Sequence, residues 1–141
     1  MTQAERDRFD ELLEGVLARL PERVAAVLEE VPLIVEDRPS PAVCRDLGIE
    51  DPNSEDALDL CGLHTGRAFT ERSVEQSGEL PNDIRVFREG VIRTAGGWRS
   101  LGRGRFSNEG RVREEIRVTV LHEIGHQFGL DEDDLADLGY D

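Results

Sequence analysis

The chain has 141 residues, 38% of them hydrophobic and 34% charged, and its formal net charge is -14. This length suits one domain around one hydrophobic core, so we expect residues 1–141 to form a single domain. The acidic balance argues against general binding to nucleic acid or anionic membranes, because both need a positive face. No apolar run approaches the roughly 20 residues of a membrane span. The charged N-terminus lacks the apolar stretch of a signal peptide, so we expect a cytoplasmic protein.

The first part of the chain reads as two helices. Apolar residues recur at helical spacing and predict an amphipathic helix over residues 5–20, with Thr2 as N-cap and Glu5 completing a capping box. Pro21 breaks this run and suits the first residue of a second helix, "PERVAAVLEE". The apolar residues of the first helix are Phe9, Leu12, Leu13, Val16, Leu17 and Leu20.

The middle of the chain predicts short strands separated by loops. "VPLIVED" (31–37) is β-branched between proline-bearing flanks, which indicates a short strand. Residues 38–56 are rich in proline and acidic residues and favour a loop with one helical turn at most. In "LDLCGLHTGRAFTERSV" (58–74), two glycines indicate a tight turn before a short extended piece. In "LPNDIRVFREGVI" (80–92), the alternation of Ile84 and Val86 predicts another strand.

The last third predicts a loop and then a long helix. Residues 93–110 interleave glycines and arginines around Trp98, and we expect a flexible segment. Val112, Ile116, Val120 and Ile124 then return at helical spacing over residues 108–128, and Gly129 is placed to end this helix. A short final helix is expected from Asp131. The expected fold is therefore α+β, with helices packed on a small sheet of few strands.

Inside the long helix, the sequence "HEIGH" carries the most specific chemical signal. His122 and His126 lie one turn apart on one face, about 5–6 Å between Cβ atoms, so both imidazoles can reach one zinc ion. Glu123 is rotated about 100° from that stripe and is close enough to take a proton from water activated by the metal. The apolar flanks indicate a half-buried helix, and ionisable histidines in such a helix need partners. We therefore predict a Zn2+ site with Glu123 as catalytic base.

A catalytic zinc usually has three protein ligands, so one more is needed. Glu132 is our prediction, because the turn at Gly129 would bring the acidic run after it back beside the metal. Asp131 and the more distant Asp134 are alternatives, although Asp131 could simply cap the next helix. His64 is another alternative, in what reads as a glycine-flanked turn. Cys44 and Cys61 lack the C-x-x-C spacing of zinc sites, and we expect two buried, reduced thiols.

These residues resemble a known family. "TVLHEIGHQFGLDEDDL" (119–135) is similar to the signature of the bacterial minimal zincin-like metallopeptidases, which carry H-E-x-G-H, a phenylalanine-glycine-leucine turn and an acidic run. The stretches 31–40, 58–74 and 80–92 are similar to the family's first strand, its turn segment and its central strand. The resemblance covers about Phe9 to Leu135.

The resemblance implies a zincin half-domain with N-terminal helices, a small mixed or antiparallel sheet and an active-site helix. It implies that His122 and His126 are zinc ligands, that Glu123 is the general base and that the acidic residue at Glu132 is the third ligand. Three features depart from the family pattern. Related zincins have histidine or aspartate at the position of Glu132, family members more often have tyrosine at the position of His64, and the Gly/Arg stretch 93–105 is longer than usual.

The leading hypothesis is a zinc-dependent peptidase acting on a peptide or protein substrate. Arginines of residues 93–105 could stabilise an oxyanion or steer acidic substrates, or that loop could be a mobile surface segment. Trp98, within the loop, could line a substrate cleft or pin the loop to the body of the domain. The alternative function is a metal-binding or interaction domain with weak or no activity. Contact of the Arg/Gly loop with RNA is disfavoured by the net charge, and the sequence does not indicate an oligomeric state.

Overall fold

The computed structural model describes residues 1–65, 83–100 and 104–127. It begins with two helices, α1 (Gln3–Ala18) and α2 (Glu22–Glu30). The predicted capping box at the start of α1 is present: Thr2 Oγ1 accepts from the Glu5 backbone N–H at 3.1 Å, and Glu5 accepts from Thr2 N at 3.0 Å. Pro21 is the N-cap of α2 rather than its first residue, because its ψ of 151° is extended.

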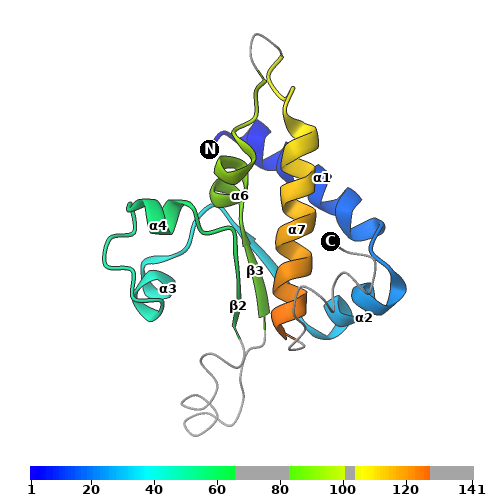
Figure 1. Ribbon diagram of the computed structural model, residues 1–141, viewed down its shortest axis with the longest axis horizontal. Helices are drawn as coiled ribbons and strands as arrows, with labels where there is room; N and C mark the ends of the chain where they lie inside the picture. The colour runs from blue at the N-terminus through cyan, green and yellow to red at the C-terminus, as the bar shows by residue number, and fades with distance from the viewer. Residues whose placement is uncertain (66–82, 101–103, 128–141) are drawn as a thin grey trace, which may run out of the picture.

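The segment 38–56 is more helical than its composition predicts. After strand β1 (Leu33–Glu36), the chain forms two short helices, α3 (Pro41–Asp46) and α4 (Glu55–Leu58). Each begins at a serine whose side chain caps it: Ser40 accepts from Val43 N at 3.2 Å, and Ser54 accepts from Ala57 N at 3.4 Å. These serine caps supply the start signal that the proline-rich composition hides. In Figure 1 the two helices lie to one side of the sheet, on the side away from α2.

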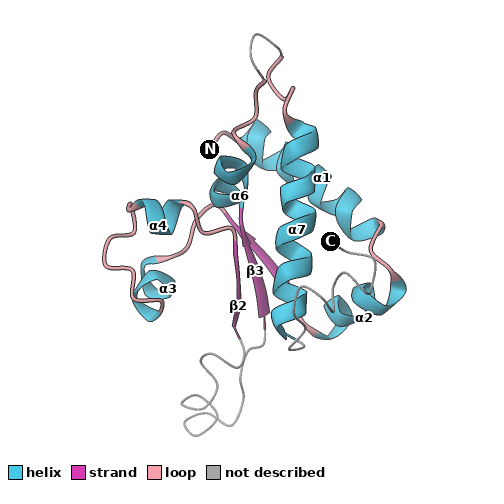
Figure 2. Cartoon of the chain, viewed as in Figure 1, coloured by secondary structure: helices cyan, strands magenta, loops and turns pink. Residues whose placement is uncertain are grey.

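The sheet has three described strands in the order β1-β3-β2, where β2 is Gly62–Thr65 and β3 is Asp83–Phe87. The central strand β3 pairs parallel with β1 and antiparallel with β2, so the sheet is mixed (Figure 2). The predicted alternation is confirmed, because Ile84 and Val86 are fully buried while Arg85, between them, pairs with Glu36 at 2.8 Å.

Directly after β3 the chain forms helix α6 (Arg88–Ala95), where the sequence had suggested only strand and flexible loop. Its buried residues Val91 and Ala95 lie four apart, on one helical face. Gly90 permits a very close approach to the chain before β2, because a Cβ there would lie 1.9 Å from the Leu60 carbonyl oxygen. Gly96, at a φ of 96°, ends the helix in the left-handed region that favours glycine.

The long helix α7 (Glu109–Gln127) lies against the sheet and α1 (Figure 1). The predicted apolar ridge of α7 is confirmed, because Val112, Ile116, Val120 and Ile124 are all at most 2% exposed. It packs in one core with residues of α1, β3 and α6, including Phe9, which is also fully buried. Truncating such a residue to alanine typically costs about 2–5 kcal/mol. This ridge fixes the rotation of α7 about its own axis.

Ion pairs tie the surface of this core together. Arg88 on α6 contacts both Asp10 of α1 and Asp37, which follows β1, each at 3.0 Å. Asp37 also binds Arg6 of α1 at 2.8 Å, and these guanidinium groups, that of Arg6 foremost, hold the pKa of the Asp37 carboxyl below its usual range. Among the described residues, no helix combines the length and apolar character needed to cross a bilayer.

Candidate metal and catalytic site

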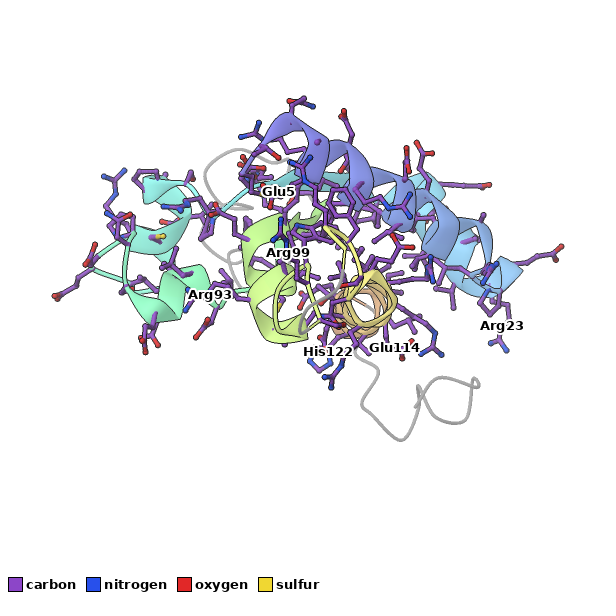
Figure 3. All side chains as sticks on the ribbon, turned by 90° about the horizontal axis from the view of Figure 1, so that it is seen from above. Glu5, Arg23, Arg93, Arg99, Glu114 and His122 are labelled. Atoms are coloured by element: carbon purple, nitrogen blue, oxygen red, sulfur yellow. The ribbon has the colours of Figure 1, made fainter. Side chains whose placement is uncertain are left out.

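The C-terminal turns of α7 carry the predicted site residues. His122 comes two residues after the buried Val120, a rotation of about 200° around the helix axis, and its side chain is exposed. Figure 3, which looks down α7, shows His122 on the side of the helix turned away from α1. The helix that buries its apolar ridge therefore presents His122 to solvent, where an ion can reach it.

Glu123, the next residue, turns toward the sheet instead. Its side chain is only 9% exposed, and it lies beside β2. A Cβ built at Gly62 would be 3.0 Å from Glu123 Cγ and 2.8 Å from Thr119 Cγ2. Gly62 therefore leaves the space in which the Glu123 side chain lies between α7 and the strand. Burial between α7 and β2 restricts where this carboxylate can lie, as a group that transfers protons to and from a bound substrate requires.

His126 lies one turn after His122, and the α7 backbone is helical through Gln127. The i, i+4 spacing therefore places positions 122 and 126 on one face of the helix, as predicted. The position of the His126 side chain is not among those that the structure describes. Glu132, Asp131 and Asp134, together with the expected final helix, lie outside the described residues. The third-ligand prediction is therefore untested.

His64 is in strand β2 and not in the turn that its flanking glycines suggested. Position 64 pairs with Ile84, just as Gly62 pairs with Val86. Because successive strand residues alternate between faces, position 64 shares with Gly62 the sheet face that meets α7. From its backbone position, His64 thus remains an alternative third ligand.

Cys61, beside Gly62, also contacts the helices at this junction. Its Sγ lies 3.2 Å from Thr94 Oγ1 of α6, and burial, reinforced by the negative charges of Glu115 and Asp59, raises the pKa of its thiol. Both cysteines are free, as predicted; Cys44 is fully buried, whereas Cys61 is only partly so. A raised pKa keeps the Cys61 thiol protonated near neutral pH, which disfavours it as a nucleophile or ligand.

Sequence reasoning missed Gly62 and Thr119, the two residues at which β2 packs closely against the C-terminal turns of α7. The signal was present in "CGLHT", because a glycine inside a strand often marks the close approach of another segment. From the sequence alone, this glycine is interpreted as part of a tight turn. Two roles were suggested for Trp98, and the structure supports the second: Trp98 is 8% exposed and belongs to the core, so it pins its loop to the body of the domain.

The residues present fit a divalent zinc ion. An exposed imidazole at His122, followed one turn later by a second histidine, offers the borderline nitrogen donors that Zn2+ favours. The adjacent buried carboxylate supplies a proton acceptor. Within the described side chains no group of three His, Cys, Asp or Glu residues could hold a metal ion. A zinc site at His122 would therefore need further ligands from outside these side chains, such as His126 and the acidic run.

A family model described as zincin-like metallopeptidase matches residues 28–140. The match begins within α2 and includes the whole sheet, α6, α7 and the acidic run. No curated protein matches the chain.

Proposed function

The chain belongs to the zincin-like metallopeptidase family, and we propose that it is a zinc-dependent peptidase in which His122 and His126 hold the metal and Glu123 is the general base. Zinc, when bound, supplies a Lewis acid that acidifies water and polarises the substrate carbonyl. The observation that supports the proposal is the contrast in exposure between two neighbouring residues of α7. His122 is open to solvent, while the neighbouring Glu123 is buried and fixed against Gly62.

In this proposal the chain's own residues perform two tasks. The imidazoles of His122 and His126 orient the ion, while the Glu123 carboxylate accepts a proton from the attacking water and passes it to the nitrogen of the leaving amine. We propose Glu132 as third ligand, on sequence grounds. Its position six residues after His126, beyond the turn that the sequence predicts at Gly129, supports this choice.

We further propose that the substrate is a short or extended peptide. Strand β2 is the outer strand on its side of the described sheet, with β3 as its paired neighbour. An extended peptide can add to such an edge through main-chain hydrogen bonds. This edge lies next to Glu123, because Gly62 of β2 is the residue that the carboxylate side chain approaches.

The experiment that tests the function is turnover of a broad peptide library by the zinc-loaded protein. Glu123→Gln should retain zinc but lower cleavage by roughly 100- to 10,000-fold, the usual worth of a general base. Glu114→Gln is the matched control, because Glu114 is an exposed glutamate of the same helix, paired with Arg117 at 3.1 Å. If zinc-loaded wild type cleaves no peptide, the alternative is correct, and the domain binds metal or a partner without peptidase activity.

The third ligand is tested by zinc analysis of two further variants. Glu132→Ala should lose zinc, and His64→Ala should retain it. The opposite result would assign the ligand to β2 and leave the acidic run as a helix cap.

A further inference from the structure

A hollow in the surface lies far from the turns of α7 that carry the histidines. It is a cavity of about 210 Å³ where the start of α1 meets the connection between α6 and α7. Figure 3 labels two of its residues, Glu5 and Arg99. Along α7 alone, the 13 residues from Glu109 to His122 span roughly 20 Å. This cavity is therefore separate from the proposed peptidase site. Its lining residues are Glu5, Trp98, Arg99, Arg105 and Phe106.

The aromatic wall of this cavity is firmly built. The Trp98 and Phe106 rings meet edge to face, with centroids 5.1 Å apart and planes at 80°. The Trp98 carbonyl accepts from Asn108 N at 2.9 Å, and the Asn108 side-chain amide donates to the carbonyls of Ala95 at 2.9 Å and Gly97 at 2.7 Å. Asn108 thus joins the end of α6 to the start of α7, and the wall needs no ligand to hold its shape.

Among the described residues, no hydrogen bond or ion pair joins the donors at this wall to a carboxylate. The Thr2 backbone N–H foremost, and to a smaller extent the charge of Arg105, lower the pKa of the Glu5 carboxyl. The Trp98 indole N–H is buried and has no hydrogen-bond acceptor within the described part of the chain. Arg99 likewise has no hydrogen bond or ion pair with a described residue. Arg105 donates to the neutral Thr2 hydroxyl at 3.3 Å, and its guanidinium lies 5.3 Å from the centre of the Phe106 ring. By contrast Arg93, on α6 just before this connection, is paired with Asp59 at 2.9 Å.

Glu5 is the one carboxylate in the lining, and it is already engaged. One of its oxygens accepts from the Thr2 backbone N–H in the capping box of α1. The first turn of a helix also carries a partial positive charge from its unpaired N–H groups. Two guanidinium groups and this helix end therefore outweigh one carboxylate, and the cavity is locally positive in a chain whose net charge is -14.

We propose that this cavity binds a tetrahedral oxyanion, namely inorganic phosphate or the phosphate group of a small molecule. The planar guanidinium groups of Arg99 and Arg105 match the paired oxygens of phosphate, and each contact is charge-assisted. The site is independent of the zinc and peptidase proposal, since it shares no residue with it.

Trp98 is the chain's one tryptophan, so its fluorescence reports directly on the cavity. The full chain is titrated with sodium phosphate against sodium chloride and sodium acetate at equal ionic strength. We expect a saturable change in emission with phosphate and none with chloride. Arg99→Gln and Arg105→Gln should each weaken phosphate binding by roughly tenfold or more, since a charge-assisted contact is lost. Arg93→Gln, whose partner Asp59 lies outside the cavity lining, should bind like wild type.

Phosphorus-31 line broadening on the wild-type protein measures the same binding without any substitution. The proposal is overturned if wild type shows no saturable response in either measurement. It is also overturned if the Arg99 and Arg105 variants titrate like wild type, or if acetate binds as tightly as phosphate. The last result would assign the cavity to carboxylates.

Discussion

Replacing Gly62 by alanine adds one methyl group where β2 touches α7. That methyl would lie 2.8 Å from Thr119 Cγ2 and 3.0 Å from both Glu123 Cγ and the Arg85 carbonyl oxygen. Non-bonded carbon atoms prefer about 3.5–4.0 Å, so the strand and helix must separate or a side chain must turn. Thr119 is β-branched and stiff, and the Arg85 carbonyl belongs to the paired strand. Glu123 is therefore the group that yields.

We expect two separable effects from Gly62→Ala. Overpacking of this kind costs about 1–3 kcal/mol of unfolding free energy. Because displacing a reacting group by about 1 Å can cost roughly 100-fold in rate, kcat should fall by about that factor, with little change in KM. Zinc affinity should stay near the wild-type value, since the His122 side chain is exposed and is not among the groups that a Cβ at position 62 would meet.

Urea denaturation, zinc titration and peptide turnover measure these effects separately. Gly15→Ala is the matched control: a Cβ at Gly15 meets nothing within 4 Å, and this exposed position in α1 should gain about 0.5–1 kcal/mol from the better helix former. The reasoning is refuted if Gly62→Ala is as stable and as active as wild type. If Gly62→Ala loses zinc but keeps full turnover per bound zinc, β2 positions the metal ligands and not the carboxylate.

Two further predictions concern titratable groups. Arg6 and Arg88 lower the folded pKa of Asp37, so the ionised Asp37 carboxylate stabilises the folded state. This contribution to the unfolding free energy should be complete above the ordinary carboxyl pKa of about 3.9 and should be lost as pH falls through the lower folded pKa. Asp37→Asn should thus cost about 1 kcal/mol at neutral pH, measured by urea denaturation, and the difference should vanish in strong acid; a difference that persists there would contradict the ion-pair explanation. Because burial raises the pKa of the Cys61 thiol, native protein should react with iodoacetamide more slowly than free cysteine at pH 8, and an equal rate would show that the thiol is open to water.

Much of the fold follows from local patterns. The capping box at Thr2, the alternation of Ile84 and Val86 and the four-residue ridge of α7 each predict an element that the structure contains. These patterns predict the structure because each element buries one face. Apolar residues therefore recur along the sequence with the period of the helix or of the strand.

The elements that the sequence did not predict depend on contacts between distant segments. Helix α6 is short, and Gly90 in its first half lowers its helical propensity. That glycine is explained by the backbone at Leu60, which is far away in the chain. In the same way, the sequence around Gly62 suggests a turn, because it does not show that Gly62 packs against Thr119 and Glu123 of α7. The motif predicted the roles of His122 and Glu123, but the packing that holds the carboxylate could not be found from spacing alone.

The central claim is that the histidines of α7 hold a zinc ion, and zinc titration of the metal-free protein by calorimetry tests it most directly. We expect one zinc per chain in wild type and in Glu114→Gln. Loss of a residue that only supports a ligand already costs about 10- to 100-fold in affinity, so His122→Ala should weaken binding by more than roughly 100-fold. Wild-type protein that takes up no zinc, or a His122→Ala variant that binds zinc as tightly as wild type, would contradict the account.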